Sequence, residues 1–158
     1  MNIGFYAGSF DPFTFGHLNV IEKSSAILDK VVVGIGSNNT KTRRFDKDVM
    51  KVAMEQIFKK RGLNNVTVVC YTNLSVDTAK EFGANILVRG IRNGMDYAYE
   101  ENLAQINFEL SGLDTIYIRA GKYGIVSSSM VYDLIANGKD ISNFVPEEII
   151  KAFSIKGE

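Results

Sequence analysis

The sequence predicts an α/β fold, with one domain over residues 1–158 built on a doubly wound, five-stranded parallel sheet that carries helices on both faces. Two observations favour this fold. Short apolar runs rich in β-branched residues alternate with longer helical patterns, and each run is continuously apolar rather than alternating. Strands buried on both faces, as in parallel sheets, have this pattern. No repeat, linker or low-complexity tract divides the chain.

Five apolar runs are the expected strands: Ile3 to Ala7, Val31 to Ile35, Val66 to Tyr71, Ile86 to Val88 and Thr115 to Ile118. Because a helical segment is expected between consecutive runs, the connections should be right-handed crossovers. Ligands of such sheets bind beyond the carboxyl ends of the strands, where the strand order reverses. The loops after the first, second, fourth and fifth runs therefore carry the candidate site.

Six segments have helical patterns: Gly16 to Asp29, Asp46 to Arg61, Ser75 to Phe82, Asp96 to Leu110, Ser127 to Asn137 and Pro146 to Phe153. Asp46 is a capping residue type, and Gly62 and Gly83 are typical residues at which helices end. Pro146 is expected in the first turn of the last helix, where proline is favoured.

Composition and charge exclude several function classes. Lys and Arg together number 18, as do Asp and Glu, so the net charge of zero provides no broad field for nucleic acid. One cysteine, Cys70, cannot form an internal disulfide, which suits a reducing cytoplasm. No segment approaches ~18 consecutive apolar residues, and the N-terminus has no signal-peptide pattern. We therefore expect a cytoplasmic protein without nucleic-acid or membrane partners.

The loop after the first run has the residue types of a phosphate-handling turn. It reads Gly8, Ser9, Phe10, Asp11, Pro12, and its glycine allows a ligand to approach the backbone closely. His17 is expected in the first turn of the next helix, where free amides and the helix dipole favour a phosphate. Gly16, just before it, adds no side-chain bulk.

Other catalytic and phosphate motifs do not match the sequence. His17 is the only histidine, which rules out multi-histidine metal sites and leaves it as the sole candidate for a Ser-His-Asp arrangement. No Gly-x-Ser-x-Gly elbow is present. The segment 36–42 lacks the Gly-Lys pair of a P-loop, and Asn39 stands where a dinucleotide fingerprint would need a third glycine.

Cationic and hydroxyl residues follow the other strands. Lys41 comes after the second run, where it either lies in a solvated loop or meets a phosphate. Arg89 and Arg92 follow the fourth run and supply fork-shaped donors for phosphate. Ser127 to Ser129 open a helix, where one hydroxyl is expected to cap the helix and the others can bind phosphate.

Gly8 to Pro12, followed by Thr14, Gly16 and His17, resembles the signature of the nucleotidylyltransferase superfamily that shares a His-x-Gly-His or Thr-x-Gly-His motif. In length, motif order and motif spacing, nearly the whole chain is similar to the bacterial phosphopantetheine adenylyltransferase family. This resemblance implies a Rossmann-like nucleotidylyltransferase fold. It also implies transfer of AMP from ATP to 4'-phosphopantetheine, giving dephospho-coenzyme A and pyrophosphate in coenzyme A synthesis.

The resemblance also implies roles for individual residues. The catalytic residues would be His17, Lys41 and Arg92. ATP would be bound by Ser9, Phe10, His17, Gly90, Ile91, Arg92, Glu100, Tyr123, Gly124, Ile125, Val126, Ser127, Ser128 and Ser129. Phosphopantetheine would be bound by Ser9, Lys41, Leu74, Ser75 and Arg89.

The family further implies a Mg²⁺ ion held by triphosphate oxygens and water rather than by protein ligands, a homo-hexamer, and feedback binding of coenzyme A. The chain departs from the family pattern at Ala7, Tyr123, Tyr132 and the segment 73–75, which is less apolar than usual. None of these is His17, Lys41 or an arginine, so the departures affect fine contacts to the substrates rather than the class of activity.

The implied chemistry needs donors rather than a base. A phosphate monoester has a second pKa of about 6 and is already a nucleophile at neutral pH. The protein must align two anions and stabilise charge that grows on the α-phosphate. We therefore expect His17 on the α-phosphate, Lys41 and Arg89 on the attacking phosphate, and the three serines on the departing pyrophosphate. Asp11 is a candidate for orienting a lysine or a Mg²⁺-bound water.

Two other functions stay open at this point. One is a transferase of the same superfamily with nicotinamide mononucleotide or glycerol phosphate as acceptor, which would be expected to lack this pairing of Ser-Ser-Ser with Arg-Gly-x-Arg. The other is a non-catalytic nucleotide-binding module, which would bind ATP through Ser127 to Ser129 without needing His17, Lys41 and Arg89 together.

Overall fold

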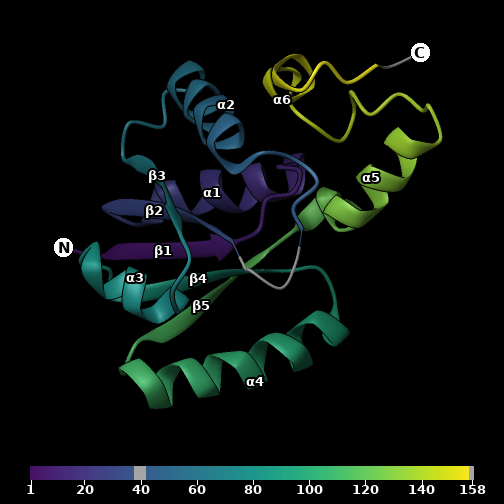
Figure 1. Cartoon of the computed structure of the whole chain (residues 1–158). Coiled ribbons are helices and arrows are strands. Elements are labelled where there is room, and N and C mark those ends of the chain that lie inside the picture. Colours follow the sequence, from purple (N-terminus) through teal and green to yellow (C-terminus); the bar gives the residue numbers. More distant parts are fainter. Residues whose placement is uncertain (38–41, 157–158) are drawn as a thin grey trace.

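A computed structural model describes residues 1–37 and 42–156. Its centre is a five-stranded parallel sheet with strand order β3-β2-β1-β4-β5 (Figure 1). The strands are β1 (Ile3–Gly8), β2 (Lys30–Gly36), β3 (Val66–Tyr71), β4 (Ile86–Ile91) and β5 (Asp114–Arg119). The predicted doubly wound α/β fold is confirmed, and each of the five apolar runs forms a strand.

Helices cover both faces of the sheet, as predicted. They are α1 (Phe15–Ile27), α2 (Lys47–Lys60), α3 (Ser75–Glu81), α4 (Gly94–Ser111), α5 (Ser128–Ala136) and α6 (Glu147–Ala152), with a short 3₁₀ turn η1 (Gly121–Tyr123) before α5. Helices α1 and α2 lie on one face and α3 and α4 on the other (Figure 1). Within the described ranges, no helix is long and apolar enough to cross a membrane.

Local capping explains where the helices begin and end. The Asp46 carboxylate accepts hydrogen bonds from the amides of Asp48 and Val49 at the start of α2. Gly112 ends α4 in the left-handed region, at φ 75°. Pro146 lies one position before the first residue of α6, so it precedes the helix rather than starting its first turn.

Neighbouring residues of the central strand β1 belong to opposite layers. Phe5 packs with Val32 and Leu87 in the cluster that α3 covers, whereas Tyr6 belongs to the cluster beneath α1 and α2. Both side chains are buried. The continuous apolar run of β1 therefore reflects two cores, one on each face of the sheet.

Strands β1 and β4 separate near their carboxyl ends. They pair only from Gly4 to Tyr6, although β1 continues along β2 to Gly8 and β4 continues along β5 to Ile91. The strand order reverses here, so this is the crevice in which such sheets bind ligands. The predicted end of β4 at Val88 was wrong: Arg89 to Ile91 belong to the strand, because its pairing with β5 continues through these residues.

Gly34 is required by the packing of two rings on β1 and β3. A Cβ atom added at residue 34 would overlap the Phe5 ring and lie 2.9 Å from Tyr71 Cε1. We expect Gly34→Ala to lower the free energy of unfolding by about 1–3 kcal/mol, as overpacking of a core does. Urea unfolding would measure this value.

Gly94→Ala is the matched control, because an added Cβ there meets no atom within 4 Å. It should leave stability unchanged or raise it slightly. Equal unfolding midpoints for the Gly34→Ala variant and the wild type would contradict the packing argument.

Candidate active site

The β1–α1 loop has a tightly folded backbone. Phe10 adopts φ 45°, a left-handed conformation that costs energy for a residue with a side chain. Its ring folds back over Gly8, where an added Cβ would lie 3.1 Å from Phe10 Cζ. The glycine thus leaves room for this ring, which an added side chain would have to displace slightly, and it also leaves the backbone accessible to a ligand.

His17 lies in the first turn of α1 and forms a capping box with Thr14. The His17 amide donates to Thr14 Oγ1 at 3.4 Å, and the Thr14 amide donates to His17 Nδ1 at 3.0 Å. Since Nδ1 accepts a hydrogen from the backbone, the proton of the neutral ring is on Nε2. The Thr14 amide therefore sets the tautomer of His17, the only histidine in the sequence.

The environment of His17 keeps its ring neutral. The ring packs against Phe10 and Phe13, with centroids 4.9 and 5.7 Å away. Burial and the charges of Arg89 and then Arg92 lower the pKa of His17 to about 4. At neutral pH the side chain therefore offers an Nε2–H donor, and Nε2 has no hydrogen-bond partner within the part of the chain that the structure describes.

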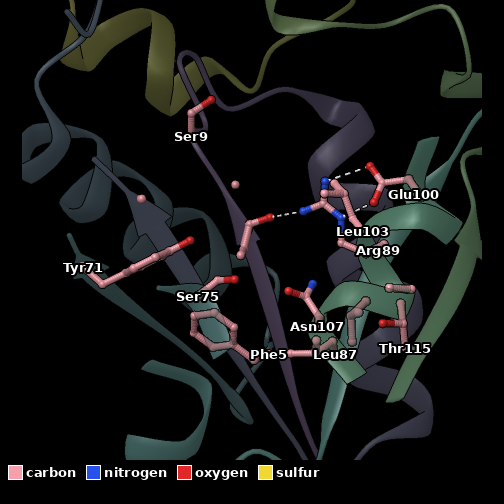
Figure 2. A pocket seen from close by; sticks show the side chains of 15 residues that line it. Phe5, Ser9, Tyr71, Ser75, Leu87, Arg89, Glu100, Leu103, Asn107 and Thr115 are labelled. Carbon is pink, nitrogen blue, oxygen red and sulfur yellow. Dashed lines mark hydrogen bonds and ion pairs between the residues drawn. The ribbon is translucent and has the colours of Figure 1, made fainter. Parts of the chain in front are cut away.

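Arg89 is held rigidly at the point where β1 and β4 separate. Its Nη1 donates to the Ala7 carbonyl at 2.6 Å, and its Nε and Nη2 donate to the two carboxylate oxygens of Glu100 at 2.8 and 2.9 Å (Figure 2). The Glu100 side chain is only 11% exposed. Burial opposes the Arg89 charge, but the hydrogen bonds and charge of Glu100 lead the effects that raise the pKa of the guanidinium.

Arg92 is oriented by Asp96 in the first turn of α4. The Arg92 amide and Nε both donate to Asp96 Oδ2 at 2.9 Å. The side-chain hydrogen bond with Arg92 lowers the pKa of the Asp96 carboxyl. Each arginine of the predicted pair is thus directed by a carboxylate of α4.

Two pockets flank the end of β1. We name them by the helix that borders each one. The α1 pocket, of about 300 Å³, is lined by Tyr6, Ala7, Gly8, Ser9, Phe10, Thr14, Gly16, His17, Val20, Arg89, Gly90, Arg92, Asp96, Glu100, Ala120, Tyr123, Val126, Ser127 and Ser128. The α4 pocket, of about 350 Å³, is lined by Phe5, Ala7, Gly8, Ser9, Gly36, Tyr71, Ser75, Leu87, Val88, Arg89, Glu100, Leu103, Ala104, Asn107 and Thr115 (Figure 2).

The two pockets share a common wall. It consists of Ala7 to Ser9 together with Arg89 and Glu100. A ligand in either pocket can therefore approach the same guanidinium. Groups bound in the two pockets can also meet at the backbone that follows β1.

The serines at the start of α5 have distinct partners. Ser127 Oγ accepts from the Met130 amide at 3.1 Å and so caps the helix, as expected for one of the three. Ser128 Oγ donates to the Pro12 carbonyl at 2.8 Å. Ser129 lines a polar pocket beside Thr42 and Arg43. The start of α5 is thereby fixed to the β1–α1 loop.

The structure gathers most, but not all, of the predicted site residues. Ten of the ATP-binding set line the α1 pocket: Ser9, Phe10, His17, Gly90, Arg92, Glu100, Tyr123, Val126, Ser127 and Ser128. Ile91, Gly124 and Ile125 do not line it, and Ile125 is 77% exposed. Ser129 lines the neighbouring polar pocket instead.

Of the residues predicted to bind phosphopantetheine, some line a pocket and others do not. Ser9, Ser75 and Arg89 line the α4 pocket. Leu74, the residue before α3, does not line this pocket and is 59% exposed. Lys41 lies outside the described residues.

Several lining residues were not predicted. Leu103, Ala104 and Asn107 follow Glu100 along α4 at the spacing i, i+3, i+4, i+7, which places all four on one face of the helix. That spacing is visible in the sequence. Phe5 and Tyr71 come from two separate strands, and only the folded sheet brings them to the same pocket.

The carboxylates of the site are already paired. Asp96 and Glu100 line the α1 pocket, and each is bound to an arginine. Among the residues that the structure describes, no group of three or more His, Cys, Asp or Glu side chains could hold a metal ion.

The state of His17 can be tested directly, because an untagged chain has one histidine and thus one imidazole signal in its NMR spectrum. We expect a midpoint near pH 4 and the Nε2–H tautomer above it. The pKa of His17 in the folded protein lies below its ordinary value of 6.5. The neutral ring therefore contributes fully to the free energy of unfolding above about pH 6.5, and this contribution is lost as the pH falls toward 4. A midpoint near 6.5, or an Nδ1–H ring, would contradict the assigned geometry.

Comparison with known proteins now identifies the family. The model of the cytidylyltransferase-like family matches residues 5–133. The chain is 41% identical to the phosphopantetheine adenylyltransferase of Porphyromonas gingivalis over 150 residues, covering 94% of this chain and 97% of that protein. It is 42% identical to the enzyme of the same name from Lachnoclostridium phytofermentans over 153 residues, covering 96% and 93%.

Solved structures agree on the fold. The nicotinic acid mononucleotide adenylyltransferase of Plasmodium falciparum, complexed with NaAD, superposes with a TM-score of 0.68 at 18% identity, over 97% of this chain and 94% of that one. The full-length relatives, at about twice that identity, decide the assignment within the fold. The chain therefore belongs to the phosphopantetheine adenylyltransferases, a group of the cytidylyltransferase-like family.

Proposed function

We propose that this protein transfers AMP from ATP to 4'-phosphopantetheine, producing dephospho-coenzyme A and pyrophosphate. The observation that carries the proposal is the shared wall between the α1 and α4 pockets. Arg89 and the residues Ala7 to Ser9 line both cavities, and His17, whose Nδ1 accepts from the Thr14 amide and whose proton is therefore on Nε2, lines one of them. Two anions bound on the two sides would meet beside cationic and neutral donors.

ATP occupies the α1 pocket in this proposal. That pocket contains the guanidinium of Arg92 and the start of α5, where backbone amides favour phosphate. Tyr123 stacks on Phe15, with centroids 5.9 Å apart, and offers a flat surface near the base and sugar. The donors of the pocket match the triphosphate, and its aromatic side matches the nucleoside.

Phosphopantetheine occupies the α4 pocket. Its walls combine apolar side chains such as Phe5 and Leu103 with the polar groups of Tyr71, Ser75 and Asn107 (Figure 2). An arm that alternates methylene and amide groups needs this mixture. Its phosphate would lie at Arg89, with Lys41 as the second cation that we propose for it.

The mechanism follows from the state of His17. The phosphate of the acceptor attacks the α-phosphorus of ATP without a general base, because the monoester is largely dianionic at neutral pH. The bond from the α-phosphorus to the α,β-bridging oxygen breaks, and pyrophosphate leaves with that oxygen. Negative charge grows on the α-phosphate oxygens, and the neutral His17 donates its Nε2–H to one of them. Arg92, fixed by Asp96, faces the triphosphate.

A Mg²⁺ ion fits the site only as a companion of ATP. The carboxylates that line the α1 pocket are paired with arginines, so they are poor ligands for an added cation. We propose that phosphate oxygens and water hold the ion, which would neutralise charge on the triphosphate.

Assembly and regulation are further parts of the proposal. Met95, Tyr99, Ile106 and Leu110 leave large exposed apolar side chains along α4, which supports self-association of the kind expected for a homo-hexamer. Coenzyme A, which contains both halves of the product, would compete with ATP as a feedback ligand. We further propose that the protein acts in the cytoplasm. Residues 1–158 would form a single catalytic domain.

Pyrophosphate release tests the activity. We expect release with ATP and phosphopantetheine, and none above background with nicotinamide mononucleotide or glycerol phosphate as acceptor. Preference for either of the latter would assign another member of the superfamily. Calorimetric ATP binding without product at saturating phosphopantetheine would indicate a non-catalytic binding module.

Replacement of His17 tests the transition-state donor. His17→Ala should lower kcat on the order of 100- to 1000-fold with a smaller change in ATP affinity, as for loss of one preorganised oxyanion donor. His17→Gln places an amide donor near the former Nε2 and should retain more activity than His17→Asn, which reaches only the Nδ1 position. The reverse order would overturn the assignment of Nε2 as donor, and near-wild-type turnover in His17→Ala would remove its catalytic role.

Replacement of the two carboxylates tests the division of substrates. Glu100 borders both pockets, whereas Asp96 borders only the α1 pocket. Glu100→Gln should raise KM for both substrates by roughly 10-fold, because it weakens charge-assisted hydrogen bonds that orient Arg89. Asp96→Asn should raise KM for ATP alone. Steady-state kinetics with each substrate varied would show the difference, and identical patterns would contradict the two-pocket assignment.

A further inference from the structure

Arg43, which the proposed mechanism does not use, binds the backbone of the β1–α1 loop. Its Nη1 donates to the Ser9 carbonyl at 2.6 Å and its Nη2 to the Phe10 carbonyl at 3.3 Å. Its Nε donates to the Phe45 carbonyl at 2.9 Å, which closes the turn before α2. One guanidinium therefore joins the segments that follow β1 and β2.

Asp11 makes the reciprocal connection. Its Oδ2 accepts from the Arg44 amide at 2.9 Å, and its Oδ1 accepts from the Phe45 amide at 2.8 Å. The Asp11 carboxylate also lies 3.8 Å from the Arg43 guanidinium. The two side chains thus exchange hydrogen bonds with the backbone of each other's segment. We call this arrangement the Asp11–Arg43 clip.

We propose that the Asp11–Arg43 clip is a positioning device for the reaction, which holds the β1–α1 loop in the conformation that presents Ser9 and His17 to the substrates. The inference rests on the proposed function, whose active site it extends. Neither residue contacts a substrate in this role. Both act through the loop backbone.

The hydrogen-bond partners of the clip favour positioning over ligand binding. All three nitrogens of the Arg43 guanidinium donate to carbonyls, and both oxygens of Asp11 accept from amides. The side chains are 15% and 14% exposed. Asp11 therefore has little capacity left for a Mg²⁺-bound water or a lysine, the roles considered for it from the sequence.

The loop transmits this constraint to the reacting groups. Phe10, whose carbonyl the clip holds, packs its ring on His17, and Thr14 at the far end of the loop donates to His17 Nδ1. A displacement of the loop would thus move the imidazole and its tautomer-setting hydrogen bond together. Misplacement of a catalytic group by about 1 Å can cost on the order of 100-fold in rate.

The test combines kinetics with the NMR signal of the single histidine. We expect Arg43→Met to lower kcat by roughly 10- to 100-fold with little change in KM for ATP, and to move the His17 pKa from about 4 toward 6.5 as the ring becomes hydrated. Arg43→Lys keeps the charge but cannot bridge three carbonyls, so it should restore only a small part of kcat. Asp11→Asn should change both readouts in the same directions.

Arg61→Met is the matched control, because Arg61 forms an ion pair with Glu22 in which both side chains are 42% exposed. It should change neither readout. If Arg43→Met unfolds the chain, Asp11→Asn, which keeps one acceptor oxygen, decides the question.

Three results would overturn the proposal. The first is a rise in KM for ATP at unchanged kcat, and the second is full rescue by Arg43→Lys; either would make Arg43 a ligand-binding cation. The third is an unchanged kcat together with an unchanged His17 signal. If the wild-type protein itself releases no pyrophosphate, the proposed function fails, whereas the His17 signal still tests the clip.

Discussion

The site depends on the separation of β1 from β4 and on the Arg89 side chain, which spans the gap between them. Beyond Tyr6 and Val88 the two strands no longer pair, so the Ala7 carbonyl lacks a strand partner on that side. Arg89 donates to this carbonyl from β4, and Glu100 holds the same guanidinium from α4. A partly buried, charge-assisted network thus takes the place of sheet hydrogen bonds where the strand order reverses. It keeps the crevice open and leaves a cation exposed to both pockets.

This arrangement explains how a chain with no net charge handles two polyanions. Arg89 and Arg92 are each directed by a carboxylate of α4, so the local field arises from oriented pairs rather than from an excess of basic residues. Burial, reinforced by these same cations, lowers the pKa of His17 and keeps its ring a neutral donor at neutral pH. The arginines that we propose for phosphate binding therefore also help to keep neutral the histidine that we propose as the donor to the α-phosphate.

Much of the fold could be predicted because it depends on local patterns. Continuous apolar runs predicted all five strands, and Asp46 and Gly62 lie at the ends of α2 where capping rules place them. The end of β4 was missed because Arg89 reads as a loop residue, although it is a strand residue at the crevice. Glu100, Leu103, Ala104 and Asn107 could have been predicted to line one pocket together, because their helical spacing places them on one face of α4. The partners of Arg43 were not, because they lie 33 and 34 residues away and meet only when β1 and β2 lie side by side.

The hydrogen bonds of the β1–α1 loop show how the proposed site residues are held in position without any substrate bound. Ser9 and Phe10 are held through their carbonyls by Arg43, Pro12 through its carbonyl by Ser128, and Thr14 through its amide by His17. These contacts come from the β2–α2 segment, from α5 and from α1, so three parts of the chain fix one short loop. In the proposed mechanism the attacking phosphate is itself the nucleophile, so the protein would contribute to the rate mainly through this preorganisation of donors. A loop that carries left-handed Phe10 can hold that geometry only because the surrounding contacts over-determine it.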